Sequence, residues 1–257
     1  MNRLENIKKI RKKLASGGFT LGTWMQIPHP SIAEILGQSG YDWVAIDMEH
    51  GSISTHQLPD LFRAIELGGT LPLARLAQAN PKDCKQALDA GAGGVIVPMV
   101  ESAEQLIMVR DACCYPPAGN RGVGYSRANL FGKNFDEYSK EAQQPILVAM
   151  IEHVDSVKAL ESILDVGGLD AILIGRWDLS ASLGITAQFE HPDFLAIMKK
   201  IRKIIEKTKV PFGVHLEKPL PNELQLKLNE GYRFLAYSVD GIFLRNMATA
   251  PVLSLEN

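Results

Sequence analysis

The chain has 257 residues, of which 46% are hydrophobic and 22% are charged. This composition is ordinary for a globular protein with a sizeable core. A formal net charge of −2 gives no positive field for nucleic acid, and no apolar run reaches the roughly eighteen residues of a membrane span. We therefore expect neither nucleic acid nor a membrane as a partner.

Basic residues gather near the start of the chain, at Lys8, Lys9, Arg11, Lys12 and Lys13. They are typical of the solvated face of a short helix. A targeting signal is disfavoured, because no apolar signal segment follows them. The sequence therefore predicts an additional helix ahead of the main fold.

Apolar, β-branched runs alternate with segments of helical periodicity along the rest of the chain. The runs predict strands at 20–27, 43–48, 71–76, 94–100, 146–152, 171–175, 211–216 and 233–239. The segments between them predict helices near 31–39, 56–68, 81–90, 102–114, 153–166, 192–208 and 222–230, with a last one near 240–255. Asn80 before Pro81 is one of several helix-start signals that support these boundaries.

Eight strand–helix units in a chain of this length predict an α/β fold, the (β/α)8 TIM barrel, as a single domain over residues 1–257. A doubly wound open sheet also alternates strands and helices. It usually carries a glycine-rich phosphate loop after its first strand, where this chain has Pro28-His29-Pro30. The barrel is therefore favoured.

The three cysteines do not form a disulfide framework. Adjacent Cys113 and Cys114 match no common zinc spacing, so we expect them to be small core residues. Unpaired cysteines fit a reducing, cytoplasmic location.

Charged side chains follow several predicted strands directly. They are Asp47, Glu49 and His50 after the second strand, Arg75 on the third, Glu152 after the fifth and Asp178 after the sixth. The carboxyl ends of parallel barrel strands meet on one face, so these groups are expected to line one mouth. Singly, each has a structural explanation, such as a surface ion pair for Arg75 or a helix cap for Asp178. Together they predict an active site.

The residue types at this mouth suggest metal and proton chemistry. Glu152 and Asp178, with no thiolate or second histidine beside them, suit a hard cation such as Mg²⁺ or Mn²⁺ better than zinc. His50 is best interpreted as a general base whose tautomer is fixed by Asp47 or Glu49. The planar donor fork of Arg75 suits a carboxylate or a developing enolate.

The chain resembles the HpcH/HpaI family of metal-dependent (class II) pyruvate aldolases. The resemblance runs in order along most of the chain, through segments 39–43, 46–50, 94–100, 115–124 and 174–184 together with Arg75 and Glu152. It implies reversible retro-aldol cleavage of a 2-keto-4-hydroxy acid to pyruvate and an aldehyde through a metal-stabilised enolate. Enzymes of this kind cleave 4-hydroxy-2-oxoheptanedioate and 2-dehydro-3-deoxyglucarate.

The resemblance also implies a role for each site residue. Glu152 and Asp178 would bind Mg²⁺, Mn²⁺ or Co²⁺; His50, partnered by Asp47, would take the 4-hydroxyl proton; Arg75 would hold the 2-keto oxygen; and the backbone at Gly175 and Trp177 would meet the substrate carboxylate. It further implies a homo-oligomer, often a hexamer with the terminal helix exchanged.

Two positions depart from the family pattern. Where the family has Pro-Ala before the metal aspartate, this chain has Arg176-Trp177, and a glutamine common in the family is here Met150. An inward Arg176 would bind a second carboxylate, whereas an outward one would be solvated. Because these residues lie near the expected substrate pocket, the sequence does not predict which 2-keto-4-hydroxy acid is cleaved.

The one long connection, 115–145, is expected to act as an active-site loop, because long loops in compact domains are often functional. Within it, Ser126 or Arg127 is expected near the aldehyde half of the substrate. His215, at the end of the seventh strand, is a secondary candidate, and a packed or loop-bonded histidine is favoured there.

Three alternatives remain. A Schiff-base aldolase needs a lysine near a strand end, and only Lys218 comes close. An acyl-CoA lyase or thioesterase of the citrate-lyase-β type would leave the Asp47–His50 pair unexplained. A barrel that kept its fold as a binding protein and lost activity is supported by Met150 and Arg176-Trp177.

Overall fold

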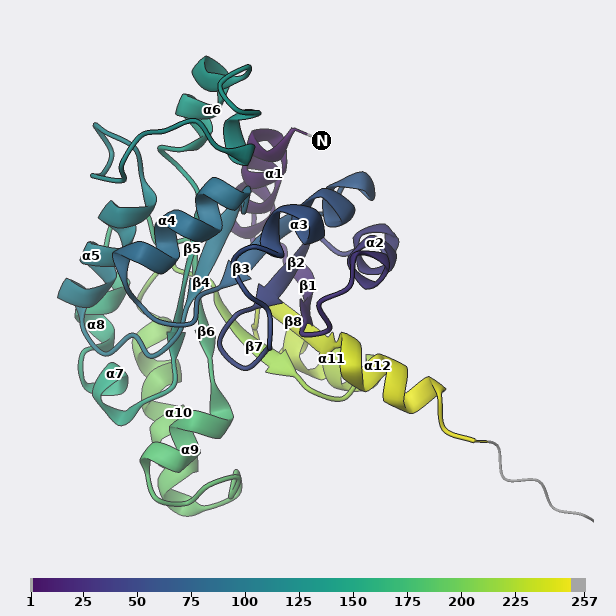
Figure 1. Ribbon diagram of the computed structural model, residues 1–257. Helices are drawn as coiled ribbons and strands as arrows, with labels where there is room; N and C mark the ends of the chain where they lie inside the picture. The colour runs from purple at the N-terminus through teal and green to yellow at the C-terminus, as the bar shows by residue number, and fades with distance from the viewer. Residues whose placement is uncertain (1, 251–257) are drawn as a thin grey trace, which may run out of the picture.

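The computed structural model describes residues 2–250, and in that part of the chain eight parallel strands close into a barrel (Figure 1). They are β1 (Thr20–Met25), β2 (Trp43–Asp47), β3 (Leu71–Arg75), β4 (Gly94–Val97), β5 (Ile146–Ile151), β6 (Ala171–Ile174), β7 (Phe212–Leu216) and β8 (Phe234–Val239). The strands pair in chain order, and β8 returns to pair with β1. The predicted (β/α)8 barrel is confirmed.

The helices surround the barrel, except that α1 covers one of its ends. They are α1 (Arg3–Ala15), α2 (Pro30–Gln38), α3 (Leu58–Leu67), α4 (Pro81–Ala90), α5 (Ala103–Cys113), α6 (Phe135–Glu141), α7 (Val154–Lys158), α8 (Leu160–Leu164), α9 (Arg176–Ser182), α10 (Pro192–Ile205), α11 (Pro221–Asn229) and α12 (Asp240–Met247), with a 3₁₀ turn η1 (Arg127–Asn129). None of those within residues 2–250 is long and apolar enough to cross a membrane.

The helix predictions were wrong in four places. The predicted helix 153–166 is two short helices, α7 and α8. The sequence did not indicate α6 or α9 as helices. The last predicted helix ends at Met247, and its final part, 251–255, lies outside the described residues.

Aromatic side chains fill the barrel interior. Trp43 is fully buried and stacks on Phe234 with 4.7 Å between ring centroids. Trp24 meets Trp43 edge-on at 6.2 Å. Gly22 makes room for this packing, because a Cβ there would lie 2.0 Å from the Trp43 ring. The strand residues that face inward therefore form a solid core and not a pore.

Helix α1 closes the amino-terminal end of the barrel. Its apolar face, Ile7, Ile10 and Leu14, is buried against the interior residues of the strands. Its lysines are exposed, which confirms the predicted solvated face for them, but Arg11 is half-buried and paired with Asp170. Because α1 blocks this end, a site for a ligand inside the barrel has to open at the other end.

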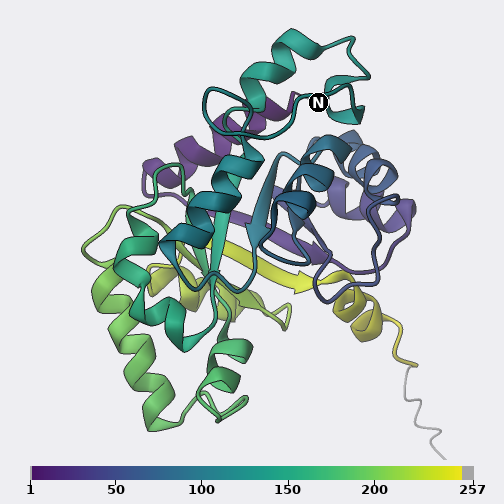
Figure 2. The ribbon, with the colours of Figure 1, turned by 60° about the vertical axis from the view of Figure 1, so that its left-hand side comes forward.

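The connection between α5 and β5 lies at the closed end, beside α1 (Figures 1 and 2). A segment that leaves an outer helix and enters a parallel strand has to start from the strand's amino end. Figure 1 shows α6 at the opposite end of the molecule from α9. The expectation that residues 115–145 form an active-site loop is therefore wrong, because they lie at the opposite end of the barrel from the carboxyl ends of the strands.

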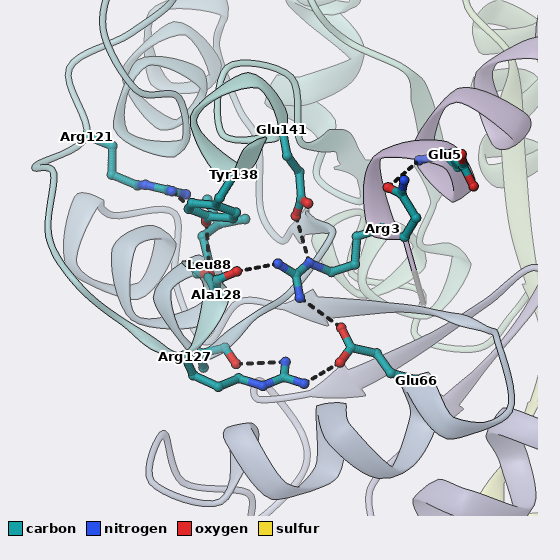
Figure 3. Close-up of polar contacts among 11 residues, drawn as sticks. Arg3, Glu5, Glu66, Leu88, Arg121, Arg127, Ala128, Tyr138 and Glu141 are labelled. Atoms are coloured by element: carbon teal, nitrogen blue, oxygen red, sulfur yellow. Dashed lines mark hydrogen bonds and ion pairs between the residues drawn. The ribbon is translucent and has the colours of Figure 1, made fainter. Parts of the chain in front are cut away.

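An ion network fastens this connection to the barrel (Figure 3). Arg3 donates to Glu141 at 2.7 Å and to Glu66 at 3.0 Å, and its third nitrogen donates to the Ala128 carbonyl at 2.5 Å. Arg127 also pairs with Glu66. The expectation that Arg127 reaches the aldehyde half is wrong here, because its guanidinium is held by α3.

The three cysteines are buried free thiols. Cys84 lies in α4, and Cys113 ends α5 with Cys114 next to it. This confirms the prediction that they are core residues.

Candidate active site

A cavity of about 230 Å³ opens at the carboxyl end of the strands. Its lining includes Trp24, Gln26, His50, Arg75, Met150, Glu152, Gly175, Arg176, Trp177, Asp178, His215 and Glu217. The structure thus brings the predicted site residues together, with Asp47 directly behind Arg75. The convergence expected for a parallel barrel is observed.

A buried ion pair forms the floor of this cavity. Asp47 and Arg75 are register partners on β2 and β3. Arg75 donates from Nε to Oδ1 at 2.9 Å and from Nη2 to Oδ2 at 2.5 Å, and its guanidinium stacks over Trp24 at 4.5 Å. Burial by itself would raise the pKa of Asp47, but the hydrogen bonds and charge of Arg75 hold it below its ordinary value. Arg75 is therefore held in one orientation.

A second carboxylate supports this pair from the first residue of α12, directly after β8. Asp240 accepts the backbone N–H groups of Gln26 at 3.0 Å and Ile27 at 2.8 Å. The Gln26 side chain in turn donates to Asp47 Oδ2 at 2.7 Å. The ends of β1 and β8 thus contribute to the orientation of Arg75.

The expected pairing of Asp47 with the His50 imidazole is not found. Asp47 Oδ1 accepts the backbone N–H groups of Glu49 and His50, each at 3.1 Å, and both carboxylate oxygens are already bonded by Arg75. The His50 Nε2 atom lies 4.0 Å from Glu49 Oε2. Glu49 is therefore the carboxylate beside the imidazole, and His50 itself lines the cavity.

Glu152 is the most deeply buried acid facing the cavity, with 1% of its surface exposed. Its Oε1 accepts the Met99 N–H at 2.7 Å, and Met99 has a φ of 48°, a left-handed conformation that is costly for a residue with a side chain. Gly175 is required beside it, because a Cβ there would lie 2.3 Å from Glu152 Oε2. Backbone strain and a glycine thus hold this carboxylate in place.

The acids around Glu152 repel one another. Burial, together with the charges of Glu49 and Asp178, raises the pKa of Glu152 to about 7, although the Met99 hydrogen bond and the charge of Arg75 act to lower it. Burial also raises the pKa of Glu49, with Asp178 among the groups that add to the shift. The site therefore carries more negative charge than its own groups can balance.

Asp178 lies in the first turn of α9, close to this cluster. The helix is capped by Gly175, so Asp178 is not the cap residue that its sequence position allowed. It is exposed at the cavity wall and carries no hydrogen bond in the described part of the chain. The side chain is free for a ligand.

The donor set fits a hard divalent cation. Glu152 and Asp178 offer carboxylate oxygens, and no thiolate is among the residues that line the cavity. Glu49 Oε2 is buried without a hydrogen bond, although Arg75 Nη1 lies 3.1 Å away. A dication beside Glu152 and Asp178 would offset the repulsion that raises the pKa of Glu152.

Another cluster brings three ligand-type side chains within 4.8 Å in the described residues: Glu101, His153 and Asp155. Its nitrogen is already used, because His153 Nδ1 caps α7 by accepting the Asp155 N–H at 3.2 Å. Asp155 also pairs with Lys158 at 2.6 Å. We therefore assign this cluster to helix capping.

The two departures from the family pattern both line the cavity. Arg176 is neither directed at a free ligand position nor solvated; its Nη2 donates to Glu217 at 3.1 Å. Trp177 Nε1 donates to the same carboxylate at 2.7 Å. Met150 is buried and adds an apolar surface. The prediction of an outward, solvated Arg176 was thus wrong: the side chain lines the cavity, and its partner there is Glu217, which directly follows β7.

His215 is a packed residue. Its Nε2 lies 3.3 Å from the Ser238 carbonyl oxygen, and its ring meets Trp24 edge-on at 5.9 Å. Burial lowers the pKa of His215 to about 4, so the ring is neutral near pH 7. Lys218 is exposed and does not line the cavity.

Sequence reasoning missed Gln26, Glu217 and Asp240. Each of them follows a strand directly, after β1, β7 and β8. The rule that found Glu152, a polar residue where a buried strand ends, would have found them too.

Comparison with known proteins gives consistent matches. A family model described as HpcH/HpaI aldolase/citrate lyase matches residues 20–247. The chain is 38% identical to a hydroxypyruvate/pyruvate aldolase of Roseobacter denitrificans over 93% of this chain and 94% of that enzyme. It is 37% identical to a 2-keto-3-deoxy-L-rhamnonate aldolase of Klebsiella pneumoniae over 76% and 74%. An HpcH/HpaI aldolase structure from Desulfitobacterium hafniense superposes with a TM-score of 0.83 at 30% identity, covering 93% of each chain.

Because of the Asp47–Arg75 pair, we expect the free energy of unfolding to fall at acid pH. Removing one partner of a buried pair costs about 3–5 kcal/mol, so Asp47→Asn should lower the free energy of unfolding by that order at pH 7. The lowered pKa of Asp47 makes its contribution complete above its ordinary value of 3.8 and progressively lost as the pH falls through the folded-state value. Urea unfolding of both proteins between pH 8 and pH 3 measures the difference, which should shrink only at the acid end.

Asp60→Asn is the matched control, because Asp60 pairs with Arg63 on an exposed helix surface. It should change the free energy of unfolding by less than about 1 kcal/mol. A pH-independent difference for Asp47→Asn, or one as small as the control, would contradict the assigned role.

Proposed function

This chain belongs to the HpcH/HpaI aldolase/citrate lyase family and is an aldolase, and from this premise we propose its reaction. The reaction is the reversible cleavage of a 2-keto-4-hydroxy acid to pyruvate and an aldehyde, dependent on a divalent metal. The observation that carries the proposal is one cavity in which a fixed Arg75 faces the mutually repelling acids Glu152 and Asp178. Such a site is arranged for negative charge that develops on a substrate oxygen beside a cation.

Glu152 and Asp178 would hold the metal, with Mg²⁺, Mn²⁺ or Co²⁺ as candidates. When bound, the cation supplies positive charge beside the oxygens of the keto acid. Glu49, next to both Arg75 and His50, supports the site and is not assigned as a ligand.

In the cleavage direction, His50 takes the proton of the 4-hydroxyl group as a general base. The C3–C4 bond then breaks, C4 becomes the carbonyl carbon of the departing aldehyde, and the bonding electron pair remains on the other fragment as the pyruvate enolate. Arg75 donates hydrogen bonds to the enolate oxygen. A proton adds at C3 to give pyruvate, so no further reactant is consumed.

Other residues of the cavity position Arg75 and the substrate for this reaction. The Arg75 guanidinium is held by Asp47 before substrate arrives, so little reorganisation is needed when charge develops. The backbone at Gly175 and Trp177, at the start of α9, is assigned to the substrate carboxylate. Met150 gives the cavity an apolar surface near Glu152.

The alternatives have less support. A Schiff-base mechanism lacks its nucleophile, since no lysine is among the described residues that line the cavity. An acyl-CoA substrate would need free cations for its phosphates, and the two lining arginines, Arg75 and Arg176, are both paired with acids. A barrel without activity would have no need for the strained Met99 backbone that holds Glu152.

The proposal includes a homo-oligomer in the cytoplasm. Exposed apolar side chains support the oligomer, among them Tyr125 and Phe131 on the α5–β5 connection and Met247 on α12. The free thiols support a reducing compartment.

The function is tested by incubating the protein with Mn²⁺ or Mg²⁺, pyruvate and glycolaldehyde and measuring 2-keto-4-hydroxy acid by chromatography. We expect product with metal and none after EDTA, because the acids of the site cannot supply positive charge. Borohydride with pyruvate should not inactivate the enzyme. Borohydride inactivation would replace the metal mechanism with a Schiff base.

His50→Ala should lower aldol turnover by about 10²–10⁴-fold, because it removes the general base. Pyruvate release, coupled to lactate dehydrogenase, measures the rate. His56→Ala is the control, since His56 is in an exposed loop bonded to Ser54, and its rate should equal that of wild type. Equal rates for both variants would show that His50 is not the base.

Metal binding distinguishes the two acid clusters. Glu152→Gln should weaken Mn²⁺ binding by at least about tenfold, measured by isothermal titration calorimetry, because it removes a ligand charge. Glu101→Gln should leave the affinity unchanged. The reverse pattern would place the metal at Glu101, His153 and Asp155.

A further inference from the structure

One wall of the cavity is built around the carboxylate of Glu217. This residue follows β7, and its Oε1 accepts the Trp177 indole N–H at 2.7 Å. Its Oε2 accepts Arg176 Nη2 at 3.1 Å. Two consecutive residues of α9 thus hold a single carboxylate at the cavity wall. A side chain fixed by two elements can select a ligand, because its orientation is set in advance.

Arg176 is engaged within the protein through its Nη2 atom, and its Nε is buried without a hydrogen-bond partner. Its charge is paired with Glu217, and its guanidinium lies over the Phe189 ring at 5.0 Å. Trp177 packs edge-on against the same ring at 5.3 Å. The Arg176 cation is therefore neutralised by Glu217. The net charge of this part of the cavity wall is close to zero.

Glu217 lines the cavity and keeps some of its hydrogen-bonding capacity. A carboxylate offers about four lone-pair positions, and the structure gives Glu217 three contacts, all from Arg176 and Trp177. The neighbouring His215 is neutral, and Met150 and Trp24 are apolar. The wall thus accepts hydrogen bonds and has no unpaired positive charge.

We propose that Glu217, held by Arg176 and Trp177, determines the aldehyde half of the substrate: it favours uncharged, hydroxylated aldehydes over aldehydes with a second carboxylate. A hydroxyl group of the aldehyde donates to the Glu217 carboxylate, whereas a second carboxylate would meet no unpaired cation on this wall, because Arg176 is already paired with Glu217. This inference rests on the proposed aldolase function and specifies its substrate class.

The test uses the Mn²⁺-loaded enzyme and measures kcat/KM for pyruvate addition to D-glyceraldehyde, propanal and succinic semialdehyde. Wild type should prefer D-glyceraldehyde to each of the other two by at least about tenfold, because a site built for a hydroxyl rejects analogues without it. Propanal tests the hydroxyl group, and succinic semialdehyde tests the absence of an unpaired cation for a second carboxylate.

Glu217→Gln keeps the shape of the side chain and removes its charge, which releases Arg176. The ratio of succinic semialdehyde to D-glyceraldehyde should rise by about tenfold or more. Adding Arg176→Met should abolish that rise, because the released cation is then absent. Glu206→Gln, an equal charge change on an exposed residue after α10, should keep the wild-type ratio. Trp177→Phe removes one of the two groups that hold Glu217, which should lower kcat/KM for D-glyceraldehyde and so raise the same ratio; it provides a second test if Glu217→Gln does not fold.

A wild-type preference for succinic semialdehyde, or an unchanged ratio in both Glu217→Gln and Trp177→Phe, would overturn the inference while leaving the aldolase function intact. Failure of the function has a different signature: wild type would form no product with any aldehyde and would not exchange the methyl hydrogens of pyruvate in D₂O in the presence of Mn²⁺. That result would overturn both.

Discussion

The buried pair of Asp47 and Arg75 is the constraint on which the site depends. A charged arginine at the end of a barrel strand is costly unless a partner neutralises it, and the register of β2 with β3 places that partner directly opposite. Gln26 and Asp240 extend the same arrangement to β1 and β8. The barrel therefore contributes more than a scaffold: closure of β8 onto β1 helps to orient the cation that faces the substrate.

Opposite this cation, the structure leaves negative charge unbalanced. Glu152 is buried beside a strained backbone and near two other acids, and its pKa of about 7 reflects this. Burying an unpaired carboxylate destabilises a fold, so its presence indicates a function that needs it. The same principle separates Glu152 from the exposed Glu101 cluster, whose charges are satisfied by a helix cap and a lysine.

The sequence predicted the barrel, its eight strands and the mouth where Glu152, Asp178 and Arg75 meet, because strand periodicity and alternation fix which ends converge. The same alternation could have placed residues 115–145 correctly, since a segment between a helix and the next strand has to lie at the amino end. Loop length was given too much weight there. Local contacts are a different matter: Asp47 was assigned to His50 from their proximity in sequence, whereas its oxygens bond Arg75 on the next strand.

What the sequence determined by itself was the fold, the family and the set of chemical groups at one end of the barrel. Each of these depends on periodicity or on the order of motifs along the chain. Only the tertiary structure decided which group bonds which: Arg75 with Asp47, Glu152 with the Met99 backbone, and Arg176 with Glu217, 41 residues away. The physical reason is that hydrogen bonds and charge neutralisation act over a few ångströms in space, and strand register sets those distances independently of sequence separation.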